Sequence, residues 1–339
     1  MVLGSWLAPV VNLPTDRIAR AQLGTASIEF LDVGQGDAVL IRSPEGKVAL
    51  VDAGPSKEIV PNLHARGIDR IDLLVLTHHH IDHYGGMAHV IGEYKPTAFL
   101  VSDSSYTSPM FLRLLKLVER EDIATIGPRY KSRKIELRSI EITVFPQAAE
   151  DVHNENNNSI GLRVQHGDAV ALLTGDSQDA ERQAWTVIAR DLVAGCDLLE
   201  LAHHGSRNRT DAGWLDLVKP KIAVVSCGRE NKFGHPHAET VALLAAKGIP
   251  LKRTDQDGTV RVKSDGKHWT IPGWLSLVTV PIPAPPATPV DDAAVDAPPP
   301  PAKVNLNTAT LQELKASLGS APSSPSGSSR RGPLIRSTT

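Results

Sequence analysis

One segment constrains the fold of this chain more than any other feature of its sequence. A nearly continuous apolar run over 71–76 is followed directly by THHHIDHYGG at 77–86. Such a run is typical of a strand that is covered on both faces of its sheet. Functional residues favour the loops after such strands, because the sheet holds each loop rigidly. The segment therefore predicts a layered α/β protein with a site at a strand end.

The polar side chains of this segment are of the kinds that bind divalent metal ions. The candidate ligands are His78, His80, Asp82 and His83, and imidazole and carboxylate groups suit zinc and related ions. A short loop cannot easily wrap four groups around one tetrahedral ion, so two adjacent ions fit better. His78 and His80 would bind one ion. Asp82 and His83 would bind the other. The alternative is a histidine-rich turn with only adventitious affinity for metals.

The pattern around this segment indicates one large domain in which strands and helices alternate. Two strand-rich halves with interleaved helices predict a layered α/β domain. Strands are expected at 28–32, 38–41, 48–51, 71–76, 135–145, 160–165, 169–173, 198–201 and 222–226, and helices at 57–66, 110–121, 179–192 and 238–247.

Changes in composition set the expected limits of this domain within the 339 residues. We place an N-terminal extension at 1–26 and the folded domain at 27–278. Residues 279–302 are dominated by Pro, Ala and Asp, which predicts a semi-extended linker. A helical pattern returns over 303–319, and the Ser-, Pro- and Gly-rich segment 320–339 is expected to be disordered.

Composition also excludes several classes of protein. The formal net charge of -2 argues against holding nucleic acid by bulk charge, although a local basic groove stays open. Two cysteines, Cys196 and Cys227, exclude a disulfide framework or a Cys-rich zinc ribbon. No apolar stretch reaches the ~18–20 residues of a membrane helix, and the first residues lack the basic start of a signal peptide. We therefore expect a cytoplasmic protein without membrane contact.

The motifs resemble those of a known fold. The pattern His78-x-His80-x-Asp82-His83 looks like the signature of the metallo-β-lactamase fold. Upstream, LDVGQGDA at 31–38 is similar to the start of the soluble hydrolase domain of ComEC-type DNA-uptake proteins. The resemblance implies an αββα sandwich with a two-metal hydrolytic site on one edge. It implies two divalent ions as cofactors, with zinc as the first expectation and manganese as the second.

Two acidic residues at other strand ends match motifs of that family. Asp52 follows the strand at 48–51. It would support the metal-binding loop 77–86 (the metal loop) without binding a metal ion itself. The alternative is a simple turn residue. Asp176 closes the sequence LLTGD. The resemblance implies that Asp176 bridges the two ions, which a carboxylate can do because it has two oxygens. The alternative for Asp176 is a helix cap.

Three further histidines are assigned to the site. His203 and His204 follow the strand at 198–201, and adjacent side chains at a strand end point in different directions. One should therefore bind metal and the other face substrate. We assign His204 to the metal and His203 to the substrate, with the reverse order left open. His235, in GHPH, resembles the last motif of the subgroup and is assigned as a substrate contact or proton donor.

The asparagine run at 156–159 lies where many relatives of the fold place a third histidine ligand. The ComEC-like subgroup tends to carry Asn and Ser there. An amide oxygen is a weaker, harder ligand than imidazole, which leaves open both the occupancy of the first site and its preference for zinc. We assign Asn158 to support of the metal loop and Asn157 to substrate binding. His153 as a replacement ligand, or a plain turn, are the alternatives.

Weaker indications come from two segments outside these motifs. Ser206 and Arg207 are assigned to substrate binding, because Arg matches phosphate bidentately. A solvated loop is the alternative. The sequence KVNLNTATLQEL at 303–314 looks like the first helix of a helix-hairpin-helix DNA-binding module. The second half of that module is missing or degenerate here.

Together these features predict a dinuclear metal-dependent hydrolase that acts as a phosphodiesterase or nuclease on DNA. A water activated by two ions would be the nucleophile, and Asp82, His203 and His235 are the residues assigned to catalysis. One alternative keeps the fold and hydrolyses a carboxylic ester, lactone or thioester instead. Another is a non-catalytic adaptor that binds DNA or protein.

Overall fold

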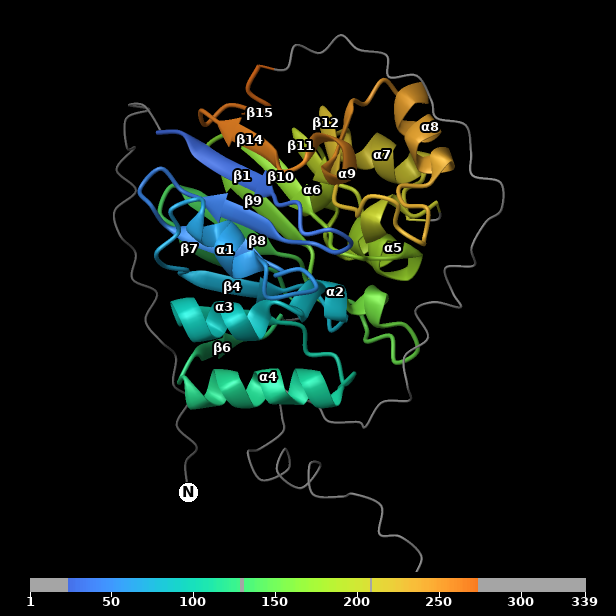
Figure 1. Cartoon of the computed structure of the whole chain (residues 1–339). Helices are drawn as coiled ribbons and strands as arrows, with labels where there is room; N and C mark the ends of the chain where they lie inside the picture. Colours follow the sequence, from blue (N-terminus) through green and yellow to red (C-terminus); the bar gives the residue numbers. More distant parts are fainter. Residues whose placement is uncertain (1–23, 129–130, 208, 274–339) are drawn as a thin grey trace, which may run out of the picture.

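The computed structural model describes residues 24–128, 131–207 and 209–273. Within these ranges two β-sheets pack face to face and helices cover their outer faces, giving four layers in the order αββα (Figure 1). The fold class predicted from the sequence is therefore confirmed. The predicted linker, the segment 303–319 and the tail 320–339 lie outside the described residues, as does residue range 1–23 of the N-terminal extension.

The first sheet contains eight strands in the order β15-β14-β1-β2-β3-β4-β5-β6. Neighbours from β15 to β3 are antiparallel, and those from β3 to β6 are parallel. The parallel strands therefore share one edge at which their carboxyl ends meet. The strands are β1 (Ala26–Phe30), β2 (Val39–Arg42), β3 (Val48–Val51), β4 (Leu73–Leu76), β5 (Ala98–Val101), β6 (Ala124–Ile126), β14 (Val260–Ser264) and β15 (Trp269–Thr270).

The second sheet contains seven strands in the order β13-β12-β11-β10-β9-β8-β7. Its neighbours from β10 to β13 are parallel, and those from β7 to β10 are antiparallel. The strands are β7 (Arg133–Leu137), β8 (Ile140–Val144), β9 (Leu162–His166), β10 (Ala169–Leu173), β11 (Leu198–Glu200), β12 (Ile222–Val225) and β13 (Leu251–Arg253).

Helices form the two outer layers (Figure 1). The first sheet is covered by α1 (Ile59–His64), α3 (Met87–Tyr94) and α4 (Pro109–Arg120), and the second by α5 (Asp179–Ile188), α6 (Arg190–Val193), α7 (Ala212–Val218) and α8 (Ala238–Ala246). Short helical turns lie in the loops: α2 (Ile81–Tyr84), η1 (Glu155–Asn158), η2 (His203–Gly205) and α9 (Thr254–Asp257).

Strand β4 shows why the apolar run before the histidines is almost continuous. Leu73 and Val75 point into the core between the two sheets. Leu74 and Leu76 point the other way, into the core beneath α1, α3 and α4. Because the side chains of a strand alternate between its faces, a strand buried on both sides needs apolar residues at every position. The end of this strand is thus held from both faces.

Two expected elements are divided in the structure. The strand expected at 135–145 is the hairpin β7–β8, in which Arg138 adopts a positive φ of 62° at the turn. The helix expected at 179–192 is two helices, α5 and α6, which are separated at Ala189 with φ of -134°. In both cases the hydrophobic pattern continues across the break, so the pattern alone does not show it.

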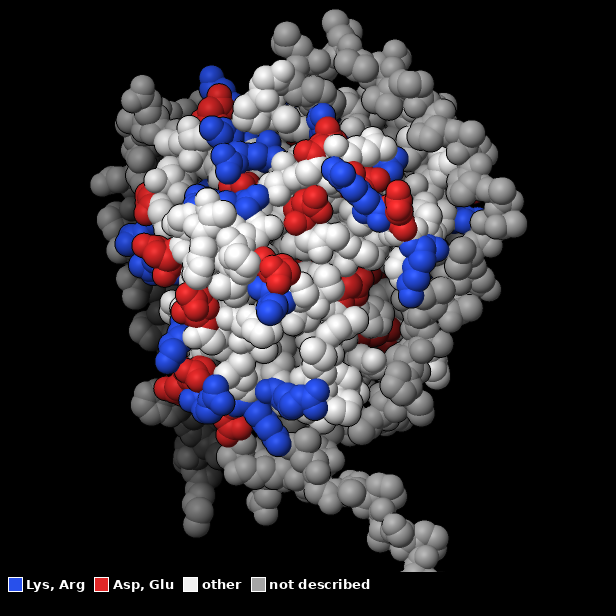
Figure 2. Space-filling view, in the orientation of Figure 1, with Lys and Arg blue, Asp and Glu red and all other residues white. Residues whose placement is uncertain are grey.

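The surface carries charges of both signs. Lys and Arg side chains lie among Asp and Glu over the face shown in Figure 2, without a large area of one sign. This mixture agrees with the formal net charge of -2. Among the described helices, none has the length and apolar character needed to span a bilayer.

Close backbone packing fixes the segment that leads out of β4 and α2. A Cβ atom on Gly86 would lie 2.3 Å from the carbonyl oxygen of Ala53 and 2.6 Å from that of Ser56. Gly86→Ala should therefore lower the free energy of unfolding by about 1–3 kcal/mol, as overpacking does. The measurement is denaturant unfolding followed by circular dichroism.

Gly92, on the exposed side of α3, provides the matched control. A Cβ atom there meets no described atom within 4 Å. Gly92→Ala should raise the stability by up to about 1 kcal/mol, because alanine has the higher helix propensity. Equal effects of the two substitutions would contradict the packing described for Gly86.

Candidate metal centre

Loops from both sheets meet at one edge of the sandwich. Asp52 follows β3, His78 follows β4, Asp176 follows β10 and His203 follows β11. These strands belong to the parallel parts of the two sheets, so their carboxyl ends lie at the same edge. Sites in open α/β sheets form outside such ends. Packing of the two sheets thus brings together residues that are far apart in the sequence.

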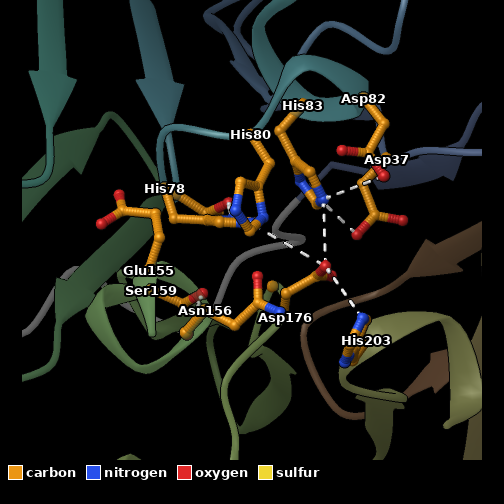
Figure 3. A network of polar contacts seen from close by, with 12 residues as sticks. Asp37, His78, His80, Asp82, His83, Glu155, Asn156, Ser159, Asp176 and His203 are labelled. Carbon is orange, nitrogen blue, oxygen red and sulfur yellow. Dashed lines mark hydrogen bonds and ion pairs between the residues drawn. The ribbon is translucent and has the colours of Figure 1, made fainter. Parts of the chain in front are cut away.

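The carboxylate of Asp176 lies among histidines that come from both sheets (Figure 3). Its Oδ2 atom is 3.4 Å from His83 Nε2, 3.7 Å from His204 Nε2 and 3.8 Å from His78 Nε2. The Nε2 atom of His203 also lies 3.8 Å from this oxygen. All five side chains are almost completely buried.

The possible ligand atoms form two groups that share Asp176. Within each group the atoms lie within 4.8 Å of one another. The first group is His78, His80 and Asp176, and the second is Asp37, His83, Asp176 and His204. Either group could hold a metal ion.

The polar atoms of this cluster fit a bound cation. His83 Nε2, His204 Nε2 and Asp176 Oδ1 are buried and have no hydrogen-bond partner among the described residues. A buried polar atom left in that state costs about 1–3 kcal/mol. A divalent ion would be a partner for all three atoms, and imidazole and carboxylate are ligands that such ions prefer.

Mutual charge effects dominate the titration of this cluster. Burial by itself would raise the pKa of Asp176, but His204 and His83 hold the pKa of this carboxyl well below its usual range. Burial likewise would lower the pKa of His83, but Asp176, Asp52 and Asp82 hold it well above its ordinary value. A cation must displace protons from such imidazoles, so its affinity should rise with pH.

Asp52 orients two parts of the loop after β4. Its Oδ1 accepts a hydrogen bond of 2.8 Å from the Thr77 amide. Its Oδ2 accepts bonds of 2.7 Å from Thr77 Oγ1 and 2.8 Å from His83 Nδ1. The last bond fixes the ring so that Nε2 faces Asp176, which is the usual carboxylate–histidine–metal arrangement. Asp52 itself has a φ of 57°, an uncommon conformation outside glycine.

A second buried acid holds the turn that carries Asp176. Glu200, at the end of β11, accepts hydrogen bonds of 2.8 Å from the Thr174 amide and 3.1 Å from the Gly175 amide. Burial, with a further contribution from Asp37, raises the pKa of Glu200 to about 8. The turn between β10 and Asp176 is therefore held by hydrogen bonds to the Glu200 carboxylate on the neighbouring strand.

The histidine pair after β11 is held in an unusual backbone conformation. His203 and His204 have φ of 49° and 53°, which costs of order 1–3 kcal/mol for a non-glycine residue. The ring of His204 is fixed because Nδ1 donates a 3.0 Å hydrogen bond to the Ser226 carbonyl. His204 thus presents Nε2 to the second ligand group, and His203 lines the pocket beside it.

The asparagine run supports the metal loop through Glu155. This buried carboxylate accepts a 2.9 Å hydrogen bond from the His79 amide. Its other oxygen accepts bonds of 2.5 Å from Ser104 Oγ and 3.0 Å from Asn158 Nδ2. Asn156 is fully buried, and Figure 3 shows its side chain between Asp176 and the His78 loop. It lies where the missing third histidine was expected.

The pocket over the cluster contains some of the predicted substrate contacts and lacks others. It is lined by Gln35, His80, Asp82, Asp176, His203, His204, Phe233 and His235. Asn157, Ser206 and Arg207 are not among these residues. Asn157 Nδ2 donates to Asp151, Arg207 Nη1 lies 3.8 Å from Glu239, and Ser206 is completely buried.

Asp37 is a candidate ligand that the sequence reasoning missed. It joins the second group, in which Asp82 had been expected. Asp82 stays close, with Oδ2 3.4 Å from His204 Nε2 and 3.9 Å from His83 Nε2. The signal for Asp37 was present in LDVGQGDA, where it follows Gly36, but that motif was used only to identify the family resemblance. Glu200 had a signal too, as an acid inside an apolar strand.

Known proteins share this sequence pattern. The family model of the metallo-beta-lactamase superfamily matches residues 31–229. ComE operon protein 3 of Bacillus subtilis (strain 168) is 27% identical in an alignment of 257 residues that covers 70% of this chain and 33% of that protein. Competence protein ComA of Neisseria gonorrhoeae is 29% identical in an alignment of 246 residues that covers 70% of this chain and 32% of that protein.

This chain spans about a third of the length of these curated relatives. Among solved structures, CmlA, a diiron β-hydroxylase from Streptomyces venezuelae, is similar with a TM-score of 0.48 and 17% identity. That likeness covers 71% of this chain and 54% of the other.

The role of Asp52 can be tested by metal binding. Asp52→Asn removes the charge that orients His83 and should weaken the binding of Zn²⁺ or Mn²⁺ by about 10–100-fold. The measurement is a competition titration with a chromogenic chelator.

Asp72→Asn is the matched control. Asp72 directly precedes β4 and is also a largely buried carboxylate, but it accepts a hydrogen bond from Lys47 and belongs to neither ligand group. The metal affinity of this variant should equal that of the wild type. An Asp52→Asn variant that binds metal as tightly as Asp72→Asn would contradict the orienting role.

Proposed function

The chain belongs to the metallo-beta-lactamase superfamily, and from this premise we propose that it is a metal-dependent hydrolase that cleaves phosphodiester bonds in DNA. The observation that carries the proposal is the position of Asp176, which the two ligand groups share. Two-metal hydrolytic sites hold their ions about 3.5–4 Å apart, and a carboxylate with two oxygens can serve as a common ligand at that separation.

The residues of the cluster would hold the ions as follows. His78, His80 and Asp176 would bind the first, and Asp37, His83, Asp176 and His204 the second. Divalent ions in such a site lower the pKa of water and stabilise negative charge on the scissile group. Asp52 and Glu200 keep their loops in place behind these ligands.

Two histidines that line the pocket are suited to work on the substrate. The ring centroid of His235 is 5.5 Å from that of His203 and 6.0 Å from that of His204. His203 and His235 come from different loops and both line the pocket. In our proposal, one donates a hydrogen bond to a charged substrate oxygen and the other a proton to the leaving oxygen.

Ligand chemistry and the relatives both support phosphodiesters over carbon esters. The second group contains two carboxylates, and Asn156 takes the place of an imidazole near the first. Oxygen ligands suit harder ions such as Mn²⁺, which also bind phosphate oxygens well. We therefore propose two divalent ions, zinc or manganese. The relatives are named as competence proteins, and a further one as recombination protein 2, names that point to DNA.

The proposal predicts a metal-dependent activity that Asp176 controls. Purified protein loaded with Mn²⁺ or Zn²⁺ should cleave single-stranded DNA and an aryl phosphodiester. Asp176→Asn should reduce both rates by at least about 100-fold, since a ligand common to both ions is lost. Activity is measured on a labelled oligonucleotide, and metal content by mass spectrometry of the digested protein.

Asp72→Asn is again the control and should retain activity. Hydrolysis of a lactone or thioester without cleavage of either phosphodiester would overturn the nuclease proposal and favour an ester hydrolase. A metal-free protein that binds DNA without cleaving it would favour an adaptor.

A further inference from the structure

The enclosed part of the site is too small for a nucleoside. The pocket beside Asp176 has a volume of about 20 Å³, and one water needs roughly 10–15 Å³ by this measure. A polymeric substrate must therefore stay at the mouth of the pocket and present only its scissile group. Residues at the mouth, rather than residues inside, then select the substrate.

Phe233 is the one benzene ring among the residues that line this pocket, as far as the described chain shows. Its side chain is half-buried, and its ring lies stacked on His235 with centroids 5.5 Å apart and an angle of 17°. The ammonium group of Lys232 lies 5.0 Å from the centre of the Phe233 ring. An aromatic ring that lines the pocket and an exposed positive charge thus lie close together.

The loop that carries Phe233 is held by a different residue. Asn231 Oδ1 accepts a 2.9 Å hydrogen bond from the His235 amide. Its Nδ2 donates to the carbonyl oxygens of Gly228 and His235, at 2.9 and 2.7 Å. Asn231 therefore links the two ends of the segment 228–235, and the Phe233 ring takes no part in these three hydrogen bonds. The Phe233 ring is half-buried and can therefore contact substrate when the Lys232 ammonium group moves off it.

We propose that Phe233 is a stacking platform for an unpaired nucleobase next to the scissile phosphate, and that Lys232 contacts a neighbouring phosphate. This inference rests on the proposed function. Aromatic side chains and basic residues are the combination by which proteins bind single strands. A base in a duplex has both faces covered, so only an unstacked base could use this platform. The mixed surface charge in Figure 2 also favours local contacts over a broad electrostatic field.

Two small esters with the same leaving group test the platform. Thymidine 5′-(4-nitrophenyl) phosphate carries a base, whereas methyl 4-nitrophenyl phosphate carries none. The readout is the ratio of their kcat/KM values, which cancels any general effect on the chemistry. Phe233→Leu should lower this ratio about 10-fold, since stacking contributes about 1–3 kcal/mol per base. Phe233→Trp should keep it, and an unchanged ratio in Phe233→Leu would overturn the proposal.

Binding without turnover separates this inference from the proposed function. In EDTA, the wild type should bind a labelled dT12 strand more tightly than an abasic strand of the same length, and Phe233→Leu should abolish the difference. Should the wild type bind in this way yet hydrolyse neither ester, the proposed function fails while the platform stands. Equal binding of both strands by the wild type overturns the platform.

The role of Lys232 is tested by salt dependence. Loss of one phosphate contact should reduce the slope of log K against log salt by about 0.7 for a single strand. Lys232→Gln should show this reduction. Lys267→Gln is the control. Lys267 is exposed in the turn between β14 and β15, which lies beside the first residue of β1, whereas the pocket residue Gln35 follows the last residue of that strand. Equal slopes for the two variants would contradict the phosphate contact.

Discussion

The carboxylate of Asp176 is the point on which the site depends. It belongs to the second sheet, and His78 and His83 approach it from the first. Neither sheet alone carries a complete ligand group. The apolar core between the sheets therefore has a functional role, because it fixes the distance between the two halves of the site.

Assembly of the cluster costs stability, and neighbouring residues offset that cost. Buried acids and imidazoles without hydrogen-bond partners are unfavourable, and Asp52 and the pair His203 and His204 adopt uncommon positive φ values. Hydrogen bonds that Asp52 and Glu200 accept from the amides of the loops hold this arrangement in place. Such local strain is typical of functional sites. Bound cations would provide the remaining compensation, so folding and metal binding are expected to be linked.

Local patterns predicted a layered α/β domain and the ligand loop after 71–76, whereas the αββα sandwich and the role of Asp176 came from the family resemblance. The segment 71–86 is informative because an apolar strand, which must be buried on both faces, is followed directly by a ligand motif. Asp37 was not recognised as a ligand, because its motif LDVGQGDA contains no histidine beside the acid and was used only for the family resemblance. The assignment of Arg207 to substrate binding stays a prediction. Its residue type suits phosphate, and its Nη1 atom lies 3.8 Å from Glu239 on α8, a contact that no local pattern encodes.

Crystals grown with manganese would test the shared carboxylate most directly. The account predicts two anomalous-scattering peaks about 3.5–4 Å apart, one beside His78 and His80 and one beside His83 and His204, with Asp176 contacting both. A single peak, or two peaks of which Asp176 contacts only one, would contradict it.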